Sequence, residues 1–351
     1  MLTFATTAPG AAPGLWDSDR VGVTRADVAR AAGVSPAVVS YVLRPGLRPV
    51  APETRERVLA AVERLGYRPN AVAQALRGGP TSSIGMLVPD HTNPFFAELA
   101  SAVEDLAFAR GYVLLMGSTA DDEEREAAYV RTFVDRRVDA LLVVAARSHP
   151  ELAIAARAGV PVVVLDRVPE GTGVSTVRTD GVSGAAVATR HLIDRGHAVI
   201  GAIAGPEHLT VTDDRLAGWR AALVEAGLPH DDDLVGHAPF TRAGGEDAAL
   251  ALLAARPDVT AVFVSSDVQA AGVLSACARL GRAVPRDLAV VAFDGTRIAP
   301  HTQPPLTVVQ QPVEQIARLA VDRLLARTGG GGPAEPTHDV LDTELVVRGS
   351  S

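Results

Sequence analysis

The stretch VTRADVARAAGVSPAVVSYVL (residues 23–43) contains two helix start signals separated by a single glycine-containing turn. Thr24 has the spacing of a capping box with the aspartate three residues later, and Gly33 is placed to end that helix in a left-handed turn. Ser35 can cap a second helix whose first turn holds Pro36, where a missing N–H is tolerated. Two short helices joined in this way have the spacing of a helix-turn-helix, whose second helix enters the major groove of DNA.

A third helix is expected to follow, beginning at Pro52 in PETRERVLAAVERLGY. Its apolar stripe is predicted to consist of Val58, Leu59, Val62 and Leu65, with the arginines on the opposite side. Three short helices would make a small all-α domain. The alternative to DNA binding is a helical bundle that holds a partner protein.

The second helix of the motif is the candidate DNA-reading element, and Val39 and Val42 would anchor it to the neighbouring helices. The residues expected to face DNA are Thr24, Ser35, Pro36, Ala37, Ser40, Tyr41 and Arg44. Pro36 and Ala37 offer apolar surface that suits a thymine methyl group, and Tyr41 offers one hydroxyl. The serine and threonine hydroxyls and the arginine are expected to contact phosphates, which position the protein on the duplex.

The charge of the chain is divided unevenly. Residues 21–80 hold nine arginines against four carboxylates, whereas the whole 351-residue chain has a formal net charge of −8. A basic module is therefore attached to an acidic one, and the basic part is the candidate contact for a polyanion. Residues 1–20, rich in Ala, Pro, Gly and Thr, are expected to be disordered.

A short helix is predicted between the two modules. Asn70 can cap a helix that runs from Ala71 to Arg77, before two glycines and a proline end it. So short a helix is only marginally stable by itself. It is therefore expected to form only when something holds it.

The acidic module alternates apolar runs with helical stretches. The runs are IGMLVP, YVLLMG, ALLVVA, VPVVVLD, VIGAIAG, AVFVSS and LAVVAFD. Short continuous apolar runs are typical of strands buried on both faces of a parallel sheet. Their alternation with helices predicts a doubly wound α/β architecture. A restart of the series near Gly181 predicts two similar subdomains with a cleft between them.

Polar and aromatic side chains follow the expected strands, at the edge where open α/β sheets bind their ligands. These residues are Asp90, Asn93, Phe95, Ser118, Arg147, Asp166, Arg167, Ser265, Ser266, Asp267 and Asp294. Carboxylates accept from hydroxyls, a guanidinium donates to two oxygens, and an aromatic ring covers a C–H face. The set therefore suits a polyhydroxylated ligand, although each residue taken alone could equally be a helix cap or a surface ion pair.

Other classes of protein are disfavoured by what the sequence lacks. Cys277 is the single cysteine, which excludes a disulfide or a thiolate metal site within one chain. No signal peptide and no apolar run of membrane-spanning length is found, so a cytoplasmic location is expected and an exported solute-binding protein is disfavoured. No dinucleotide fingerprint, P-loop, nucleophile elbow or metal-spaced histidine pair is visible. No enzyme activity, cofactor or metal is therefore expected.

Seven segments, in order and spacing, resemble the LacI family of bacterial transcription regulators. They are VTRADVARAAGVSPAVVSYVL, VAPETRERVLAAVERLGYRPNAVAQALR, IGMLVPDHTNPFFAEL, HLIDRGHAVIGAIAGP, DRLAGWRAAL, VVAFDG and PPLTVVQQP, and the resemblance runs from Val21 to Val347. It implies a periplasmic-binding-protein-like core, a homodimer and double-stranded operator DNA as the partner. It also implies that the short helix is a hinge that wedges Leu76 into the minor groove, with Ala73 allowing the paired helices to approach. The alternative is that Leu76 only packs within a linker.

The resemblance also assigns cleft residues. Arg215 in DRLAGW and Asp294 in AFDG match positions that contact the effector in the family. Asp180 matches a cleft acid of several members, and Phe240 matches an aromatic that stacks on the ligand.

Two positions depart from the family pattern. Ser266 replaces a common asparagine that reads sugar hydroxyls, and Leu209 stands where the purine-responsive branch has a guanine-contacting arginine. By analogy, a sugar or sugar derivative is favoured as the effector over a purine.

The expected organisation is a disordered extension at 1–20, a helix-turn-helix domain at 21–68, a hinge helix and linker at 69–81, and a core at 82–351. Within the core, the N-subdomain is expected at 82–180 plus 311–330 and the C-subdomain at 181–310 plus 336–348. The chain would cross between them near Asp180, Gln311 and the GGGGPAEP stretch. The predicted function is that of a homodimeric repressor, without a membrane partner, that a small molecule releases from a near-palindromic operator. The alternatives are a core that binds a non-sugar or protein coeffector, or a solute-binding protein.

Overall fold

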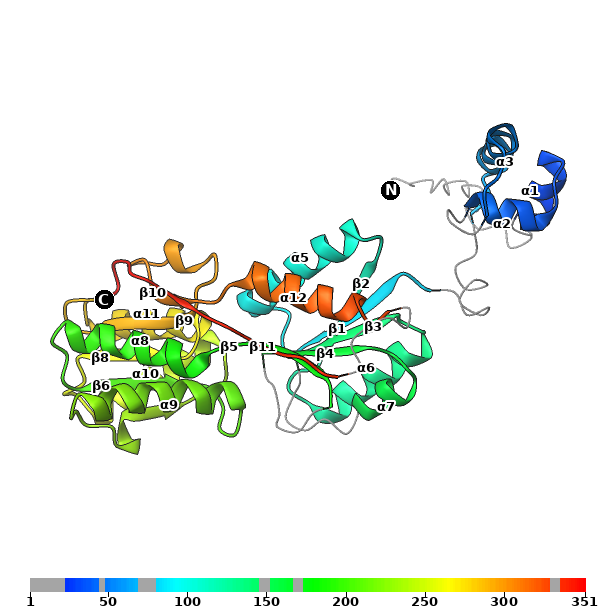
Figure 1. Ribbon diagram of the computed structural model, residues 1–351. Helices are drawn as coiled ribbons and strands as arrows, with labels where there is room; N and C mark the ends of the chain where they lie inside the picture. The colour runs from blue at the N-terminus through cyan, green and yellow to red at the C-terminus, as the bar shows by residue number, and fades with distance from the viewer. Residues whose placement is uncertain (1–22, 44–47, 69–79, 145–151, 167–172, 329–334) are drawn as a thin grey trace, which may run out of the picture. The chain divides into compact units, whose positions relative to one another are not determined.

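The computed structural model describes residues 23–43, 48–68, 80–144, 152–166, 173–328 and 335–351. The chain divides into two compact units, Met1–Gly79 and Pro80–Ser351 (Figure 1). Six of the predicted functional residues lie outside the described residues: Arg44, Asn70, Ala73, Leu76, Arg147 and Arg167. The roles assigned to these six side chains stay predictions.

The first unit is a three-helix domain around a small aliphatic core. Its helices are α1 (Arg25–Ala32), α2 (Pro36–Leu43) and α3 (Pro52–Leu65). The buried side chains are Val28, Ala29, Ala32, Val39, Val42, Val58 and Ala61. The predicted capping box is present, because the N–H of Asp27 donates to Thr24 Oγ1 at 3.3 Å and the N–H of Thr24 donates to Asp27 Oδ2 at 3.0 Å. Gly33 follows α1 with a φ of +65°, as the left-handed turn requires.

The apolar stripe of α3 differs from the prediction at one position. Val58 and Ala61 are buried, whereas the side chain of Leu59 is 42% exposed. A helix turns by roughly 100° per residue, so a stripe that starts at position 58 continues at 61, 62 and 65. The assignment of Leu59 to the core stripe was therefore wrong.

The second unit contains two six-stranded sheets, each covered by helices. The N lobe has strands β1 (Ser83–Val88), β2 (Val113–Ser118), β3 (Ala140–Val143), β4 (Val162–Leu165), β5 (Ser175–Thr179) and β11 (His338–Leu341) in the order β11-β5-β4-β3-β1-β2. All of its pairs are parallel. Its helices are α5 (Pro94–Ala109), α6 (Glu123–Asp135), α7 (Leu152–Arg157) and α12 (Val313–Leu325), and α12 lies beside α5 (Figure 1).

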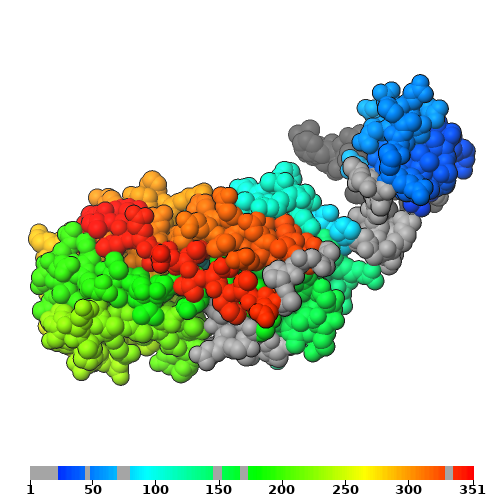
Figure 2. Space-filling model, viewed as in Figure 1, coloured from blue at the N-terminus to red at the C-terminus, as the bar shows by residue number. Residues whose placement is uncertain are grey.

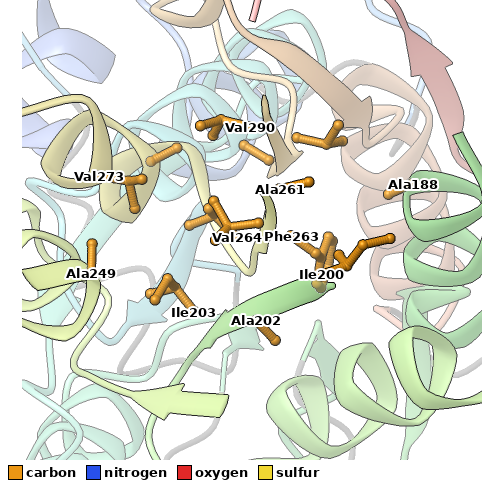
Figure 3. Packing of buried hydrophobic residues seen from close by; sticks show 14 of the residues in the cluster. Ala188, Ile200, Ala202, Ile203, Ala249, Ala261, Phe263, Val264, Val273 and Val290 are labelled. Atoms are coloured by element: carbon orange, nitrogen blue, oxygen red, sulfur yellow. The ribbon is translucent and has the colours of Figure 1, made fainter. Parts of the chain in front are cut away.

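The C lobe repeats this plan. Its strands are β6 (Ile200–Ala204), β7 (Val235–His237), β8 (Ala261–Val264), β9 (Ala289–Asp294), β10 (Thr307–Gln310) and β12 (Glu344–Val346), in the order β12-β10-β9-β8-β6-β7. Only β12 is antiparallel to its neighbour. Its helices are α8 (Gly181–Asp194), α9 (Thr210–Glu225), α10 (Arg242–Ala255) and α11 (Asp267–Leu280), with short 3₁₀ turns at Asp232–Leu234 and Ala299–His301. Side chains of β6, β8 and β9 meet those of the flanking helices in a wholly apolar core (Figure 3). The predicted doubly wound architecture is confirmed.

In the described residues, the chain passes between the lobes three times. The first crossing follows β5 at Asp180 and the second follows β10 at Gln311, close to the predicted positions. The third lies at residues 342–343, between β11 of the N-lobe sheet and β12 of the C-lobe sheet, where the C-terminal segment runs along the surface of both lobes (Figure 2). Residues 338–341 therefore belong to the N lobe, and their placement in the C-subdomain was wrong. The resemblance implied a crossing near the GGGGPAEP stretch, but this stretch precedes β11 in the sequence, so the crossing falls after it.

The run YVLLMG also differs from its prediction as a fully buried strand. It forms β2, the edge strand of the N-lobe sheet, where Val113, Leu115 and Met116 are 60%, 36% and 45% exposed. Phe108, on the preceding helix α5, is 78% exposed. These four side chains, at the edge of the N-lobe sheet, are not covered by the described part of the chain. In the described residues, no helix is long and apolar enough to span a bilayer.

Candidate functional site

The second helix of the first unit presents its N-terminal end to solvent. Ser35, Pro36 and Ala37 are exposed, while Val39 and Val42 are buried at 0% and 2% exposure, as predicted. Because the buried valines fix the helix against α1 and α3, the exposed turn is held rigidly. A helix N-terminus presented in this way fits the major groove.

Two of the predicted phosphate contacts are already engaged within the domain. Ser40 Oγ donates to the carbonyl of Pro36 at 3.1 Å and accepts from Arg25 Nη1 at 2.7 Å. The Thr24 hydroxyl donates to Asp27 Oδ2 at 2.6 Å. Arg25 was not among the predicted contacts, although its guanidinium reaches Ser40 of α2, the recognition helix of the motif. Its place at the first position of α1 is the signal that could have suggested it.

In the second unit, polar and aromatic residues from both lobes line a hollow between them. Its lining consists of Asn93, Phe95, Phe96, Asp166, Val211, Arg215, Phe240, Ser266 and Asp294. A second hollow of about 240 Å³ adjoins it, lined by Pro89, Asp90, Asn93, Phe96, Ser118, Ala120, Asp121, Pro206, Pro239, Phe240 and Thr241. Asn93, Phe96 and Phe240 border both. We call the two hollows together the cleft.

An arginine–aspartate pair forms the floor of the cleft on the C-lobe side. Arg215 Nη2 lies 3.6 Å from Asp294 Oδ1, and the two side chains are 5% and 6% exposed. Arg215 Nη1 donates to the carbonyl of Ser265 at 2.5 Å. The guanidinium also lies over the ring of Phe293, 4.0 Å from its centroid. These three contacts hold the guanidinium plane in one orientation.

Burial raises the pKa of the Asp294 carboxyl well above its ordinary value. Arg215 opposes this increase, whereas the neighbouring carboxylates of Asp267 and Asp166 add to it. Asp294 has a φ of +104°, a backbone conformation that side chains rarely adopt. Strain and a perturbed buried acid at one position are typical of a binding site rather than of a structural core.

Several buried polar atoms beside this pair have no hydrogen-bond partner in the described structure. They are Arg215 Nε, Thr212 Oγ1, Ser265 Oγ and Asp267 Oδ1. An unsatisfied buried donor or acceptor is destabilising by about 1–3 kcal/mol. Arg215 lines the first hollow, whereas Thr212, Ser265 and Asp267 line neither hollow, so these unsatisfied atoms lie behind the surface of the cleft.

Asp267 does not line the cleft, which departs from its prediction as a contact residue. Its carboxylate is 2% exposed, and Oδ2 accepts from both the N–H of Thr296 at 2.6 Å and the Thr296 hydroxyl at 2.8 Å. Burial raises the pKa of Asp267. Asp267 is the first residue of α11, after Ser266 caps it, so its side chain turns back toward the β9 loop. It therefore supports the loop that carries Asp294.

The N lobe contributes the aromatic wall. Asn93 caps α5 by accepting from the N–H of Phe95 at 3.0 Å, and Pro94 occupies the first helical position. Phe95 and Phe96 are 3% and 5% exposed, and their rings form an edge-to-face pair with centroids 5.3 Å apart. The cap therefore fixes which face of α5 presents its rings to the cleft.

The structure brings most of the predicted cleft residues together. Asn93, Phe95, Arg215, Phe240, Ser266 and Asp294 share the first hollow, and Asp90 and Ser118 line the second. Asp180 lines neither hollow, because it caps α8 and its two carboxylate oxygens accept from the N–H and the hydroxyl of Ser183. Its prediction as an effector contact is not supported by this position.

The sequence analysis missed eight lining residues: Pro89, Phe96, Ala120, Asp121, Pro206, Val211, Pro239 and Thr241. Phe96 and Val211 lie on helices, and the other six lie in the segments that follow β1, β2, β6 and β7. The aromatic dipeptide at residues 95–96 was a usable signal for Phe96. Nothing in the local sequence distinguishes Val211 from an ordinary core valine.

The arrangement described so far defines a class of protein: a small helix-turn-helix unit joined to a two-lobed core with a polar cleft between its sheets. Comparison with known families agrees with this. Residues 24–70 match the model of the lacI family of bacterial regulatory proteins, and residues 189–351 match a periplasmic binding protein-like domain.

Full-length relatives show the same organisation. The chain is 34% identical over 326 residues to the transcriptional repressor PurR of Photobacterium profundum, covering 92% of this chain and 97% of the relative. It is 38% identical over 306 residues to the ribose operon repressor of Escherichia coli, covering 87% and 92%. The lac repressor dimer bound to operator and the anti-inducer ONPF superposes with a TM-score of 0.83 at 28% identity, covering 93% of this chain and 98% of that one. The chain therefore belongs to the LacI family of DNA-binding transcriptional repressors, which are not enzymes.

Proposed function

We propose that this repressor binds a near-palindromic operator as a homodimer and is released from it by a sugar or sugar derivative held in the cleft. The observation that carries the effector proposal is the buried Arg215–Asp294 pair, which forms the floor of a hollow walled by Phe95, Phe96 and Phe240. A guanidinium and a carboxylate recognise vicinal hydroxyls, and aromatic rings cover the C–H faces of a sugar.

Leu209 supports a sugar over a purine. It occupies the position before α9 and is 3% exposed, so this position offers no hydrogen bond to a base. A purine base remains the second candidate effector, because one of the similar repressors is PurR. A non-sugar or protein coeffector is the third.

Thermal unfolding of the full-length chain against sugars, sugar phosphates, nucleosides, purine bases and amino acids tests the effector class. A compound at one hundred times its dissociation constant adds ~2.7 kcal/mol to the free energy of unfolding. We expect stabilisation by a sugar or sugar derivative. Stabilisation by a purine base alone would contradict the proposal. If no compound of the panel raises the unfolding midpoint, a protein coeffector is favoured.

Exposed apolar side chains at the edge of the N-lobe sheet support a homodimer. Phe108 on α5 and Val113, Leu115 and Met116 on the edge strand β2 are all exposed, and exposed apolar groups gathered at one edge are typical of a protein–protein contact. The similar lac repressor structure is a dimer. We expect Met116→Glu to give monomers in sedimentation equilibrium, whereas Val224→Glu, at an exposed apolar residue of the C lobe, should leave the dimer intact.

Operator binding is proposed to depend on the recognition helix and on the hinge segment. Leu76 lies outside the described residues and keeps its predicted role as a wedge at the operator centre. Leu76→Ala is expected to abolish specific binding to the operator while nonspecific DNA binding persists. An unchanged ratio of specific to nonspecific affinity in fluorescence anisotropy would contradict the wedge.

The two halves of the proposal are joined by lobe movement. A ligand that contacts both lobes favours the arrangement in which both walls of the cleft reach it. That shift releases DNA only if the operator-bound dimer and the effector-bound dimer prefer different lobe arrangements.

A further inference from the structure

A buried glutamine at the second crossing contacts the cleft on one side and the first crossing on the other. Gln311 is 2% exposed. Its Nε2 donates to Asp294 Oδ1 at 2.9 Å, and its Oε1 accepts from Thr179 Oγ1 at 2.8 Å. Thr179 is the last residue of β5, directly before the first crossing. One side chain therefore joins the floor of the cleft to both crossings.

The backbone tightens this contact. The N–H of Gln311 donates to the carbonyl of Asp294 at 2.9 Å. Gly295, with a φ of +72°, lies so close to the second crossing that a Cβ there would come within 2.5 Å of the Gln310 Cα. The loop that carries Asp294 therefore cannot shift without displacing the second crossing.

When Asp294 is ionised, the amide of Gln311 has one orientation. The Asp294 carboxylate accepts hydrogen bonds when it is ionised, so the NH₂ group must face it, which leaves the amide oxygen for the Thr179 hydroxyl. The reverse orientation would place the amide oxygen against the carboxylate. The chain of hydrogen bonds therefore has a fixed direction from the first crossing to the cleft.

We propose that Gln311 is a positioning residue that couples the occupancy of Asp294 to the angle between the lobes. A ligand hydroxyl that donates to Asp294 competes with the amide of Gln311 for the same carboxylate. A weaker Gln311–Asp294 bond frees the amide to turn, and the Thr179 hydroxyl at the first crossing then loses its acceptor. This coupling regulates the repressor only if the proposed function holds and an effector binds in the cleft. The coupling itself can be tested without any ligand.

Other contacts between the lobes are less suited to this role. Arg178 of the N lobe pairs with Asp214 of the C lobe at 3.2 Å, but the side chains are 37% and 29% exposed. Arg297 of the C lobe contacts Glu98 of the N lobe and is 80% exposed. Water-accessible ion pairs contribute little to an equilibrium, whereas a buried hydrogen bond that loses its partner leaves an unsatisfied group.

Single-molecule energy transfer on the ligand-free, full-length protein tests the coupling. Dyes are placed on cysteines introduced at Ala128 in α6 and Ala251 in α10, both exposed, and labelled chains are diluted into unlabelled ones. Cys277 is 1% exposed and does not compete for the label. Three variants are compared with the parent: Thr179→Val removes the hydroxyl, Thr179→Ser retains it, and Gln311→Met removes both hydrogen bonds of the amide.

We expect the parent and Thr179→Ser to show the same distribution of transfer efficiency. Both Thr179→Val and Gln311→Met remove the hydrogen bond between Thr179 and Gln311. Each should therefore change the ratio of lobe arrangements by about fivefold, as expected for the loss of that one buried hydrogen bond. Equal behaviour of Thr179→Val and Thr179→Ser would overturn the proposal, because packing rather than the hydroxyl would then be responsible. Parent-like transfer in Thr179→Val would overturn it as well.

A pH series separates the two halves of the chain of hydrogen bonds. Only Gln311→Met removes a donor from Asp294, and that donor lowers the pKa of the carboxyl. In Gln311→Met the unfolding temperature should therefore change over a higher pH range than in the parent, because the pKa of Asp294 is higher. In Thr179→Val the unfolding temperature should depend on pH as it does in the parent. A parent-like profile in Gln311→Met would show that the amide does not act on Asp294.

Discussion

The two lobes share one strand order but differ in the side chains that they fix at the cleft. The C lobe supplies buried charge, with Arg215 and Asp294 at its floor and Asp267 behind them. The N lobe supplies the rings of Phe95 and Phe96 on a capped helix. The same α/β plan therefore holds a buried ion pair in one lobe and an aromatic pair in the other, while the N lobe also lines the cleft with Asp166 and the C lobe with Phe240.

This difference indicates which lobe a ligand meets as a formed site. The charges of the C lobe are oriented by contacts within that lobe, since Arg215 is held by Ser265 and Phe293. The charges of Arg215 and Asp294 lose their water when the protein folds, so ligand binding does not bear this cost. The floor of the cleft is therefore preorganised. The N lobe then adds contact area when it closes. Substitutions in the C lobe should accordingly have larger effects than those in the N lobe.

The largest effect is expected from Arg215→Ala. It removes the cation that pairs with the buried Asp294 and should destabilise the fold by about 3–5 kcal/mol at a pH where that carboxylate is ionised. Effector binding should weaken by about a hundredfold or more, because the ligand loses a charged donor, while operator binding by the folded fraction persists. Isothermal titration with the sugar found in the thermal screen measures this.

Arg220→Ala is the matched control, because Arg220 lies on the same helix α9 and pairs with exposed Asp232. It should retain the effector affinity of the parent. A normal effector response in Arg215→Ala would contradict the proposal that the buried charges of the C lobe bind the effector.

The second effect is a pH dependence that originates in the C lobe. Burial raises the pKa of Asp294 from 3.8 to about 8, so the folded state binds a proton that the unfolded state has released. The stability that this group contributes is present below the unfolded pKa and is lost as the pH rises toward the folded pKa. The free energy of unfolding should therefore fall between about pH 4 and about pH 8, which urea titrations at fixed pH would measure.

Asp294→Asn is the control for this dependence, since an amide does not titrate. Its unfolding free energy should decline less over the same range. An equally steep decline in Asp294→Asn would assign the pH dependence to other groups.

The smallest effect is expected in the N lobe. Phe95→Leu keeps an apolar side chain at a 3% exposed position and should lower the unfolding free energy by less than about 1.5 kcal/mol. Effector affinity should fall by about tenfold, since the edge of a ring that covers the sugar is lost. Phe108→Leu, on the exposed face of the same helix, is the control and should leave effector affinity unchanged. A loss in Phe95→Leu as large as that in Arg215→Ala would contradict the division of roles between the lobes.

Much of this organisation could be predicted, because helix caps and buried strands depend on residues that are close together in the sequence. The Thr24 capping box and Gly33 define α1 by hydrogen bonds within four residues, and the structure forms both. The apolar runs of the core specify strands because a strand buried on both faces tolerates little else. Arg215 and Asp294 were identified through their family positions, and their pairing is consistent with a shared site.

The failures share one cause, which is that neighbours distant in the sequence decide burial. Leu59 and strand β2 were expected to be buried because they are apolar. Leu59 is instead exposed on the outside of its domain, and β2 is the edge strand of its sheet. Asp180 and Asp267 carry the right chemical group at the right strand ends. Their side chains are nevertheless turned into a helix cap and toward Thr296.

The sequence by itself determined the helix-turn-helix, the two α/β repeats and the chemical types of residue at the cleft, since each depends on periodicity, caps or motif spacing. Only the tertiary structure decided which of those residues meet, where the third crossing falls, and that Gln311 joins Asp294 to Thr179. The physical reason is that a buried hydrogen bond depends on the position and orientation of two groups brought together by the whole fold. Residues 132 positions apart along the chain carry no local signal of such a contact.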